Sequence, residues 1–358
     1  MDAEGQLAVI YKGPIEIDQL LIDIGQLSLP PEERRRVASL FEGRWSSSVR
    51  GHRLLFIALD LLANGKLEET LNYLECNRAV LSQDREYFKL LINLGQVYSG
   101  QDEHRVAKTY YREALKIKPD LARAHYNLAV TFALEGRFDE AIDHFRQAVV
   151  AEPADWQARF NLAKALATQR NFREAISQFR QVIEINPTYV AARVELGTVL
   201  GLHGKFDAAI EQLHYVLRNH PDNAQVHARL GQVFLMSSDL AQAVDHLEKA
   251  IQFNPQDRMS MLRLSWLCAT SPLETVRNGA RAVELAKRLD QATGHKDYRV
   301  LDTLAAAYVE QGDFVAASRA AARSLDRIGR NQKAVADGIR ARLKLYQSNR
   351  PFRDISSD

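Results

Sequence analysis

The stretch ARAHYNLAVTFALEGRFDEAIDHFRQAVVAEP, residues 122–153, decides the fold of this chain. It holds two helix-like segments with Gly136 between them, and the second segment runs out into Pro153. Glycine permits the positive φ of a tight turn, whereas proline cannot continue a helix and restricts the residue before it. The stretch therefore predicts a helix, a turn and a second helix that ends at a proline-bearing turn.

The pattern returns along the chain with a period of 34 residues. This interval separates five successive prolines, Pro119, Pro153, Pro187, Pro221 and Pro255. Large and small apolar residues precede each proline at fixed offsets, which in the quoted stretch are occupied by Leu128, Ala129, Phe132, Ala141, Phe145 and Ala148. Small residues let two helices approach closely, and large ones fill the seam between them. Five units in phase predict a stack of helix pairs.

These residues and their spacing resemble the tetratricopeptide repeat (TPR) family, whose unit is a helix–turn–helix. The resemblance implies an all-α fold, a right-handed superhelical solenoid of such repeats. The family often has tryptophan at the fourth position of the repeat, and this sequence departs from that pattern with Leu91, His125, Arg159, Arg193 and His227.

The resemblance places a TPR array over residues 51–331. Its repeats are predicted over 51–84, 88–121, 122–155, 156–189, 190–223, 224–257, 258–297 and 298–331. In the seventh repeat, TSPLETVRNG (270–279) is expected to form a lengthened loop between the two helices. Residues 332–358 are expected to hold a C-terminal capping helix over 333–347 and a tail, because the last repeat of a stack needs its apolar face covered.

Residues 1–48 depart from the repeat pattern. GQLAVIYKG (5–13) alternates like a strand, and IEIDQLLIDI (15–24) and residues 30–45 read as helices. The strand and the helix after it resemble the closing hairpin and last helix of a thioredoxin-like domain, although the Cys-x-x-Cys of such a domain is missing. The alternative is a short strand and helix that pack on the first repeat.

The composition limits the classes of partner and location. The 47 basic and 45 acidic residues give a net charge of +2, so no global charge favours binding to nucleic acid or to an anionic membrane. Cys76 and Cys268 are expected to be reduced, and no run of 18 apolar residues suggests a transmembrane helix. The first residues do not read as a secretory signal, so the expected location is cytoplasmic.

No arrangement of residues typical of an enzyme occurs in the sequence. Gly204 and Lys205 are similar to the end of a phosphate-binding loop, but Phe206 follows where Ser or Thr is required. The ten histidines are scattered rather than grouped as metal ligands. The sequence therefore predicts a protein without catalytic activity, cofactor or metal.

The TPR resemblance implies a concave face lined by the first helix of each repeat, with ligand contacts from positions two, five, six, nine, twelve and thirteen. Position six is Asn93, Asn127 and Asn161 in three successive repeats. These resemble the asparagine ladder in the repeat domain of O-linked N-acetylglucosamine transferase, where amides hold a peptide backbone. An amide both donates and accepts, so it can pair with a peptide group of any residue. The alternative is a row of consensus surface residues without a ligand.

Other side chains at these positions indicate the chemistry of the ligand. They are basic or aromatic, and they comprise Lys89, Arg123, Tyr126, Phe160 and Lys164, followed by Arg229 and Arg263 at position six of later repeats. This mixture favours an extended peptide with acidic character. The two-carboxylate clamp of chaperone-binding members is not expected, because Ile92 and Gln96, or Tyr126 and Val130, stand where it needs Lys and Asn.

The predicted function is a non-enzymatic scaffold that binds an extended peptide or protein partner in its concave groove. Two alternatives remain open. One is a structural or self-associating repeat protein whose groove is filled by its own N-terminus or by another copy. The other is the detached regulatory tail of a redox multidomain protein.

Overall fold

The computed structural model describes residues 47–329 and 331–354, and every regular element in that part of the chain is an α-helix. The first helices of the successive pairs are α3 (Ser47–Ala63), α5 (Tyr87–Gly100), α7 (Ala122–Leu134), α9 (Trp156–Thr168), α11 (Val190–Leu202), α13 (Ala224–Met236), α15 (Arg258–Thr270) and α17 (Tyr298–Glu310). The second helices are α4 (Leu67–Leu81), α6 (His104–Ile117), α8 (Phe138–Ala151), α10 (Phe172–Ile185), α12 (Phe206–Asn219), α14 (Leu240–Phe253), α16 (Gly279–Ala292) and α18 (Phe314–Arg327), and α19 (Lys333–Gln347) follows them. The strand and helices predicted within residues 5–45 lie outside the described residues.

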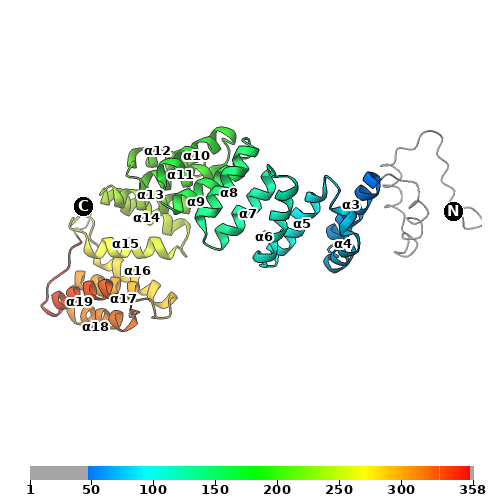
Figure 1. Ribbon diagram of the computed structural model, residues 1–358. Helices are drawn as coiled ribbons and strands as arrows, with labels where there is room; N and C mark the ends of the chain where they lie inside the picture. The colour runs from blue at the N-terminus through cyan, green and yellow to red at the C-terminus, as the bar shows by residue number, and fades with distance from the viewer. Residues whose placement is uncertain (1–46, 330, 355–358) are drawn as a thin grey trace, which may run out of the picture. The chain divides into compact units, whose positions relative to one another are not determined.

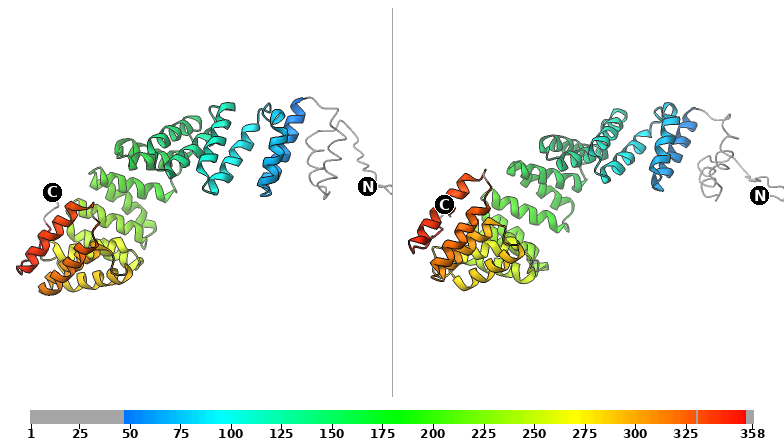
Figure 2. Two further views of the ribbon diagram at one scale, coloured as in Figure 1. Left: turned by 60° about the horizontal axis from the view of Figure 1, so that its bottom comes forward. Right: turned by 90° about the horizontal axis from the view of Figure 1, so that it is seen from below.

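The chain divides into two compact units, residues 1–153 and 154–358. The first contains α3 to α8 and the second contains α9 to α19, and each is described by itself. Within each unit the helix pairs pack one on the next, as the ribbon diagrams show (Figures 1 and 2). The all-α solenoid of helix–turn–helix repeats that the sequence predicts is confirmed.

The turn inside a helix pair bends at one residue with positive φ. Glycine occupies this place in four pairs, at Gly65, Gly136, Gly204 and Gly312, with φ between 74° and 79°. The same place holds Asp102, Arg170 and Ser238 in three other pairs, at φ of 61°, 59° and 62°. A residue with a side chain pays roughly 1–2 kcal/mol in this left-handed region. The backbone geometry of the turn is therefore set by the packing of the two helices, and glycine is the residue that adopts it without strain.

Small residues at position eight of the first helices are required by the closeness of the second helices. A Cβ added to Gly197 would lie 2.7 Å from Cγ of Leu213, which is closer than packed carbon atoms approach. Two repeats earlier, Ala129 of α7 and Ala141 of α8 are fully buried, each against the helix that carries the other. The predicted role of small residues in the seam is confirmed.

The C-terminal repeats contain the one long loop inside a helix pair of the described array, residues 271–278 between α15 and α16. It falls where the sequence predicts a lengthened loop. Helix α19 has the bounds predicted for the capping helix, and its Ile339 and Tyr346 pack against Ala305 of α17 and Ala317 of α18. It thereby covers the apolar face of the last pair.

Candidate peptide-binding site

The three asparagines of the predicted row occupy the same position on successive first helices. Asn93 lies on α5, Asn127 on α7 and Asn161 on α9, and each is half-buried. The two residues after each asparagine, such as Leu128 and Ala129, are fully buried in the seam. Each asparagine therefore lies at the edge of the seam. Because α5 and α7 belong to the first unit and α9 to the second, the row is described in two parts.

Asn127 has an unsatisfied amide group. Its Nδ2 atom is shielded from solvent and has no hydrogen-bond partner among the residues that the structure describes. Its backbone carbonyl accepts a hydrogen bond from Thr131 Oγ1 at 2.8 Å. A buried donor without a partner costs about 1–3 kcal/mol. A peptide carbonyl is the kind of acceptor that would pair with this donor.

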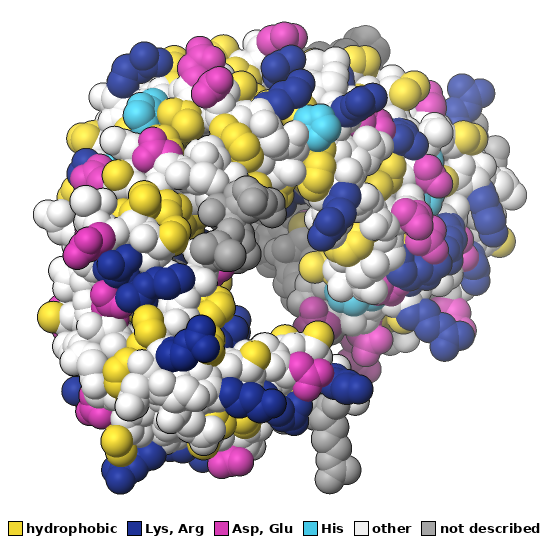
Figure 3. Space-filling view, turned by 90° about the vertical axis from the view of Figure 1, so that its left-hand side faces the viewer, with side chains coloured by type: hydrophobic (Ala, Val, Ile, Leu, Met, Phe, Trp, Pro, Cys, Tyr) yellow, Lys and Arg dark blue, Asp and Glu magenta, His cyan; other side chains and the backbone are white. Residues whose placement is uncertain are grey.

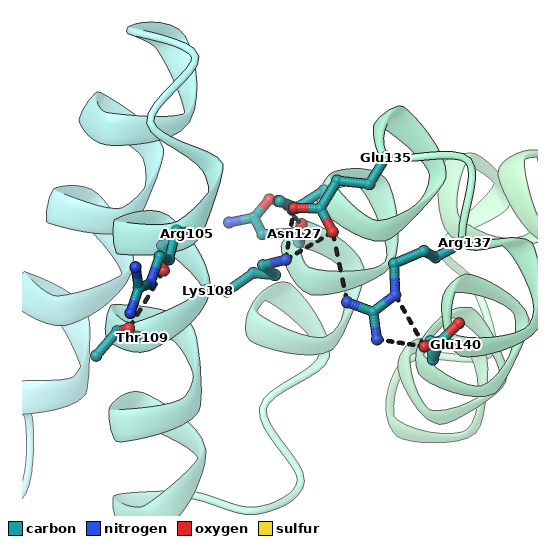
Figure 4. A network of polar contacts seen from close by, with 8 residues as sticks. Arg105, Lys108, Thr109, Asn127, Glu135, Arg137 and Glu140 are labelled. Carbon is teal, nitrogen blue, oxygen red and sulfur yellow. Dashed lines mark hydrogen bonds and ion pairs between the residues drawn. The ribbon is translucent and has the colours of Figure 1, made fainter.

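A partly buried ion pair joins α6 to the end of the helix that carries Asn127 (Figure 4). Lys108 of α6 donates to the two carboxylate oxygens of Glu135, at the end of α7, over 2.5 and 2.6 Å. This hydrogen bond lowers the pKa of Glu135, although burial acts against it. Arg137 lies 3.6 Å from Glu135 and also pairs with Glu140. Lys108 was not among the predicted site residues, and its role is to lock one repeat against the next.

In the first unit, each predicted contact residue other than the asparagines contacts another side chain of the array. Arg123 of α7 donates from Nη2 to Oε1 of Gln96 on α5 over 3.0 Å. Tyr126 is half-buried, and its ring lies edge-on to Phe145 with centroids 5.9 Å apart. Lys89 is exposed and pairs with Glu86 at 2.9 Å. Gln96 stands at position nine, so the resemblance would have pointed to it as a contact residue.

In the second unit, Phe160 belongs to an aromatic cluster at the start of α9 and α11. Its ring centroid lies 5.6 Å from Phe179 and 5.1 Å from Tyr189. Trp156 stacks at an angle on Tyr189 with centroids 4.4 Å apart. Nζ of Lys164 lies 5.7 Å from the Phe160 centroid, within range of a cation–π contact. The sequence pointed to Phe160 and Lys164 but not to Trp156, the first residue of α9, or to Tyr189, the residue before α11.

Arg229 and Arg263 continue position six on α13 and α15, and both are half-buried. Burial lowers the pKa of Arg263, and the positive charge of Arg229 lowers it further. Two neighbouring guanidinium groups repel each other in partly dry surroundings. A carboxylate placed between them would relieve this repulsion.

Two histidine pairs, one buried and one half-buried, each include a residue at the place where the family often has tryptophan. In one pair, Nδ1 of His227 lies 2.9 Å from Nδ1 of His246, and Nε2 of His227 lies 2.9 Å from the carbonyl oxygen of Pro221. The carbonyl can only accept, so Nε2 of His227 carries a proton, and His246 donates to His227 in the neutral pair. His125 and His144 repeat this arrangement at 3.0 Å. Within the described part of the chain, no group of three or more His, Cys, Asp or Glu is placed to hold a metal ion.

The C-terminal tail lies on the face of α15 and α17 that corresponds to the predicted groove. The backbone N–H of Asp354 donates to the carbonyl of Thr270 over 2.8 Å, and Nε1 of Trp266 donates to Oδ2 of Asp354 over 2.7 Å. Trp266 and Thr270 stand at positions nine and thirteen of their repeat. Both positions are among those that the TPR resemblance names for ligand contacts. The sequence did not predict that the tail itself would occupy them.

Two further side chains of the tail meet matched partners on the same face. Arg353 lies 2.8 Å from Glu310 at the end of α17. The ring of Phe352 lies 6.0 Å from that of Trp266, and the guanidinium of Arg342 on α19 lies 5.4 Å from each ring. Arg342 in turn pairs with the buried Asp302 of α17 at 2.6 Å. An extended segment is therefore held by a backbone bond, an ion pair and an aromatic contact.

Two open cavities lie away from the predicted row, both in the second unit. One, of about 490 Å³, is lined by Arg173, Ile176, Ser177, Arg180, Gln181, Glu184, His203 and Lys205. The other, of about 680 Å³, is lined by Arg258, Ala292, Thr293, Lys296, Asp297, Tyr298, Arg299 and Gln332. Neither contains a predicted site residue. On the face shown in Figure 3, basic side chains are interspersed with acidic and hydrophobic ones rather than gathered in one patch.

Comparison with known proteins identifies the repeats. The tetratricopeptide repeat family matches residues 92–157, 135–190, 160–200 and 194–258. Residues 92–258 therefore consist of tetratricopeptide repeats, a family whose members are in general non-catalytic protein-interaction scaffolds. No curated protein is significantly similar to the chain in sequence. None of the described helices is long and apolar enough to cross a membrane.

The chain is similar to several solved structures. PilW, described as a widely conserved type IV pilus biogenesis factor, is 21% identical over 61% of this chain and 96% of its own, with a TM-score of 0.51. YrrB, described as a TPR protein with an unusual peptide-binding site, is 22% identical over 52% of this chain and 95% of its own, with a TM-score of 0.47. A tetratricopeptide repeat protein from Parabacteroides merdae is 15% identical over 83% of this chain and 98% of its own, with a TM-score of 0.48. The likeness to PilW, at 21% identity, concerns the fold alone.

Proposed function

We propose that this chain is a non-catalytic scaffold that binds an extended segment of a partner protein along the first helices of its repeats. The asparagines at position six would pair with the backbone of the segment. The neighbouring contacts would come from Lys89, Arg123, Tyr126, Phe160, Lys164, Arg229 and Arg263. As part of this proposal, residues 51–331 form the array, residues 1–48 a separate segment, and residues 332–358 the cap and tail.

The observation that carries the proposal is the tail on α15 and α17. Residues 351–354 have no regular secondary structure, and Asp354 makes both a backbone and a side-chain bond to the first helix of a repeat. Position nine recurs on α5, α7 and α9 as Gln96, Val130 and Lys164. The unpaired Nδ2 of Asn127 supports the proposal as well, because it is a donor that awaits an acceptor.

The charge of the row favours a partner segment with acidic residues. The cationic side chains at the contact positions outnumber the acidic ones, and Arg229 lowers the pKa of Arg263. A carboxylate near these two groups would form charge-assisted hydrogen bonds, which are stronger than those between neutral groups. Three amide bonds of roughly 0.5–1.5 kcal/mol each fall short of the cost of association, so such contacts are needed.

The test begins with a displayed library of extended peptides, from which the tightest binder is taken for fluorescence anisotropy. The variant Asn93→Ala/Asn127→Ala/Asn161→Ala should bind it about 30- to 1,000-fold more weakly, the equivalent of about 2–4 kcal/mol. The matched control carries Asn77→Ala, Asn171→Ala and Asn186→Ala, which lie on α4 and in turns. Equal affinities for the two triple variants, with unchanged melting curves, would refute the role of the row.

Self-association is the rival explanation for an occupied groove. Size-exclusion chromatography with light scattering distinguishes self-association from the binding of a partner. Self-association is favoured if the assembly grows with protein concentration and is lost when residues 1–45 are deleted. A cytoplasmic location remains part of the proposal, and the redox alternative depends on residues 1–48, of which only the start of α3 is described.

A further inference from the structure

The tail leaves α19 in a direction set by the backbone. Asn349 has φ of 53°, its N–H donates to the carbonyl of Tyr346 over 3.0 Å, and the N–H of Arg350 donates to Leu345 over 2.9 Å. This pair of bonds around a left-handed residue is the Schellman motif that ends many helices. Pro351 follows, and its ring fixes its own φ at about −65°. The end of α19 therefore directs the tail across α15 and α17.

The lengthened loop after α15 creates the acceptors that the tail uses. Ser271 at the end of α15 is extended, with φ of −51° and ψ of 138°, so the helix does not continue into the tight turn of the other pairs. The carbonyls of Ala269 and Thr270 are therefore open to an outside donor. Thr270 accepts the N–H of Asp354 at 2.8 Å, and Nη1 of Arg353 lies 3.5 Å from the carbonyl oxygen of Ala269. The negative end of the α15 dipole favours the charge of Arg353 here.

The loop also prepares the acidic partner of the tail. Nε of Arg277 donates to Oε1 of Glu310 over 3.0 Å, while Oε2 of the same carboxylate faces Arg353 at 2.8 Å. Arg277 in turn donates to the carbonyls of Ser271 and Pro272, which hold it in place. Glu310 is thus oriented by the fold, and one of its oxygens is left for a basic side chain. The loop and α17 therefore preform this site, and the tail is not needed to orient Glu310.

We propose that this face of α15 and α17 is a peptide-binding surface that the tail covers in the free chain and that a partner segment of the same chemistry occupies in its place. The segment carries an aromatic, a basic and an acidic residue in the order of Phe352, Arg353 and Asp354. This inference rests on the proposed function, because it assigns to the last repeats the same use of positions nine and thirteen. It goes beyond the proposed function because it names the chemistry of the bound segment and identifies the C-terminal tail as its competitor.

Tethering explains how so few contacts keep the surface covered. Phe352, Arg353 and Asp354 are only half-buried and Pro351 is exposed. A short connection to α19 holds the tail at an effective concentration of about the millimolar range. A free segment with the same contacts must exceed this concentration, whereas a segment with additional contacts elsewhere on the array displaces the tail more readily.

The experiment uses the full chain and a fluorescein-labelled peptide of residues 349–354, Asn-Arg-Pro-Phe-Arg-Asp. The variant Phe352→Ala/Arg353→Ala releases the tail, and Arg350→Ala removes a charge from an exposed tail residue as the matched control. In anisotropy measurements the peptide should bind the released variant at least about tenfold more tightly than the wild type and the control. Adding Trp266→Phe to the released variant keeps a ring but removes the N–H, and should weaken binding at least about fivefold.

Several outcomes would overturn the inference. These are equal binding to the wild type and the released variant, equal binding of a scrambled peptide, and no binding to a released variant whose circular dichroism melt matches that of the wild type. If the double variant melts early, Arg353→Ala alone takes its place. A wild-type dimer in light scattering that the released variant lacks would show exchange of tails between copies instead. The asparagine variant in the released background should bind the peptide unchanged, so failure of the row and failure of this surface are distinguished.

Discussion

Acid should weaken the second unit through the pair of His227 and His246. His246 is 6% exposed. Burial, together with the neighbouring His227, lowers its pKa from 6.5 to about 4. Nδ1 of His246 lies 2.9 Å from Nδ1 of His227, so a charged His246 would be held in a buried site beside a second imidazole. His214 lies on the other side of His246, with centroids 5.8 Å apart, and Lys249 adds a further positive charge.

The size of the effect follows from the difference in pKa between the folded and unfolded chain. Because His246 binds its proton less readily when folded, the unfolded state holds more protons below about pH 6.5. The stabilisation is complete above that pH and is lost as the pH falls toward about 4. A pKa lowered from 6.5 to about 4 corresponds to about 2–3 kcal/mol of unfolding free energy between about pH 7.5 and pH 4.5.

Urea unfolding followed by circular dichroism at the two pH values measures this loss. The wild type should lose about 2–3 kcal/mol more than His246→Gln, which cannot titrate but can still donate to His227. His220→Gln, at an exposed position, should behave like the wild type. Carboxylates that titrate in the same range contribute equally to all three proteins, so the comparison isolates the pair. If His246→Gln is as sensitive to acid as the wild type, the pair is not the source and the reasoning is wrong.

Two further predictions concern backbone strain and a buried ion pair. Gly136→Ala should destabilise the protein by about 1–2 kcal/mol, because φ at Gly136 is 75°. Arg170→Gly should stabilise it by up to about 1 kcal/mol, because Arg170 has φ of 59°. Thermal melts measure both changes, and destabilisation by Arg170→Gly would contradict this account of the turn. Arg342→Met leaves Asp302 buried without its counter-ion and should cost about 3–5 kcal/mol near neutral pH. Because burial already raises the pKa of Asp302, this cost should shrink as the pH falls and the carboxyl group binds a proton; a cost in urea unfolding that does not change with pH would argue against it.

The fold could be predicted from the sequence because repetition multiplies a weak signal. One helix-like stretch before one proline is ambiguous, but the same offsets from Pro119 to Pro255 leave a single period and hence a single fold. The predicted bounds of the capping helix, 333–347, agree with α19 because the apolar spacing and the polar residues at its ends coincide. The place of Asn127 on its helix was likewise predictable, since helical periodicity decides the face on which a residue lies.

The partners of the site residues were harder to predict, because they lie far apart in the sequence. Lys108 and Glu135 are separated by 27 residues, and Trp266 and Asp354 by 88. The first of these separations crosses a repeat boundary, and the second crosses two helix pairs and the cap. The histidine pairs did carry a usable signal, since each joins residues 19 apart and the arrangement occurs twice in the same register.

The covered end of the solenoid also bears on how many copies of this chain can join together. A stack of repeats is open in one dimension, so an uncovered last pair presents a surface to which the first pair of another copy can add, and such a head-to-tail contact has no built-in end. Here α19 lies on Ala305 and Ala317, and residues 350–354 seal the adjoining face of α15 and α17. Loss of α19 should therefore expose, at this end of the array, an apolar surface to which another copy could add.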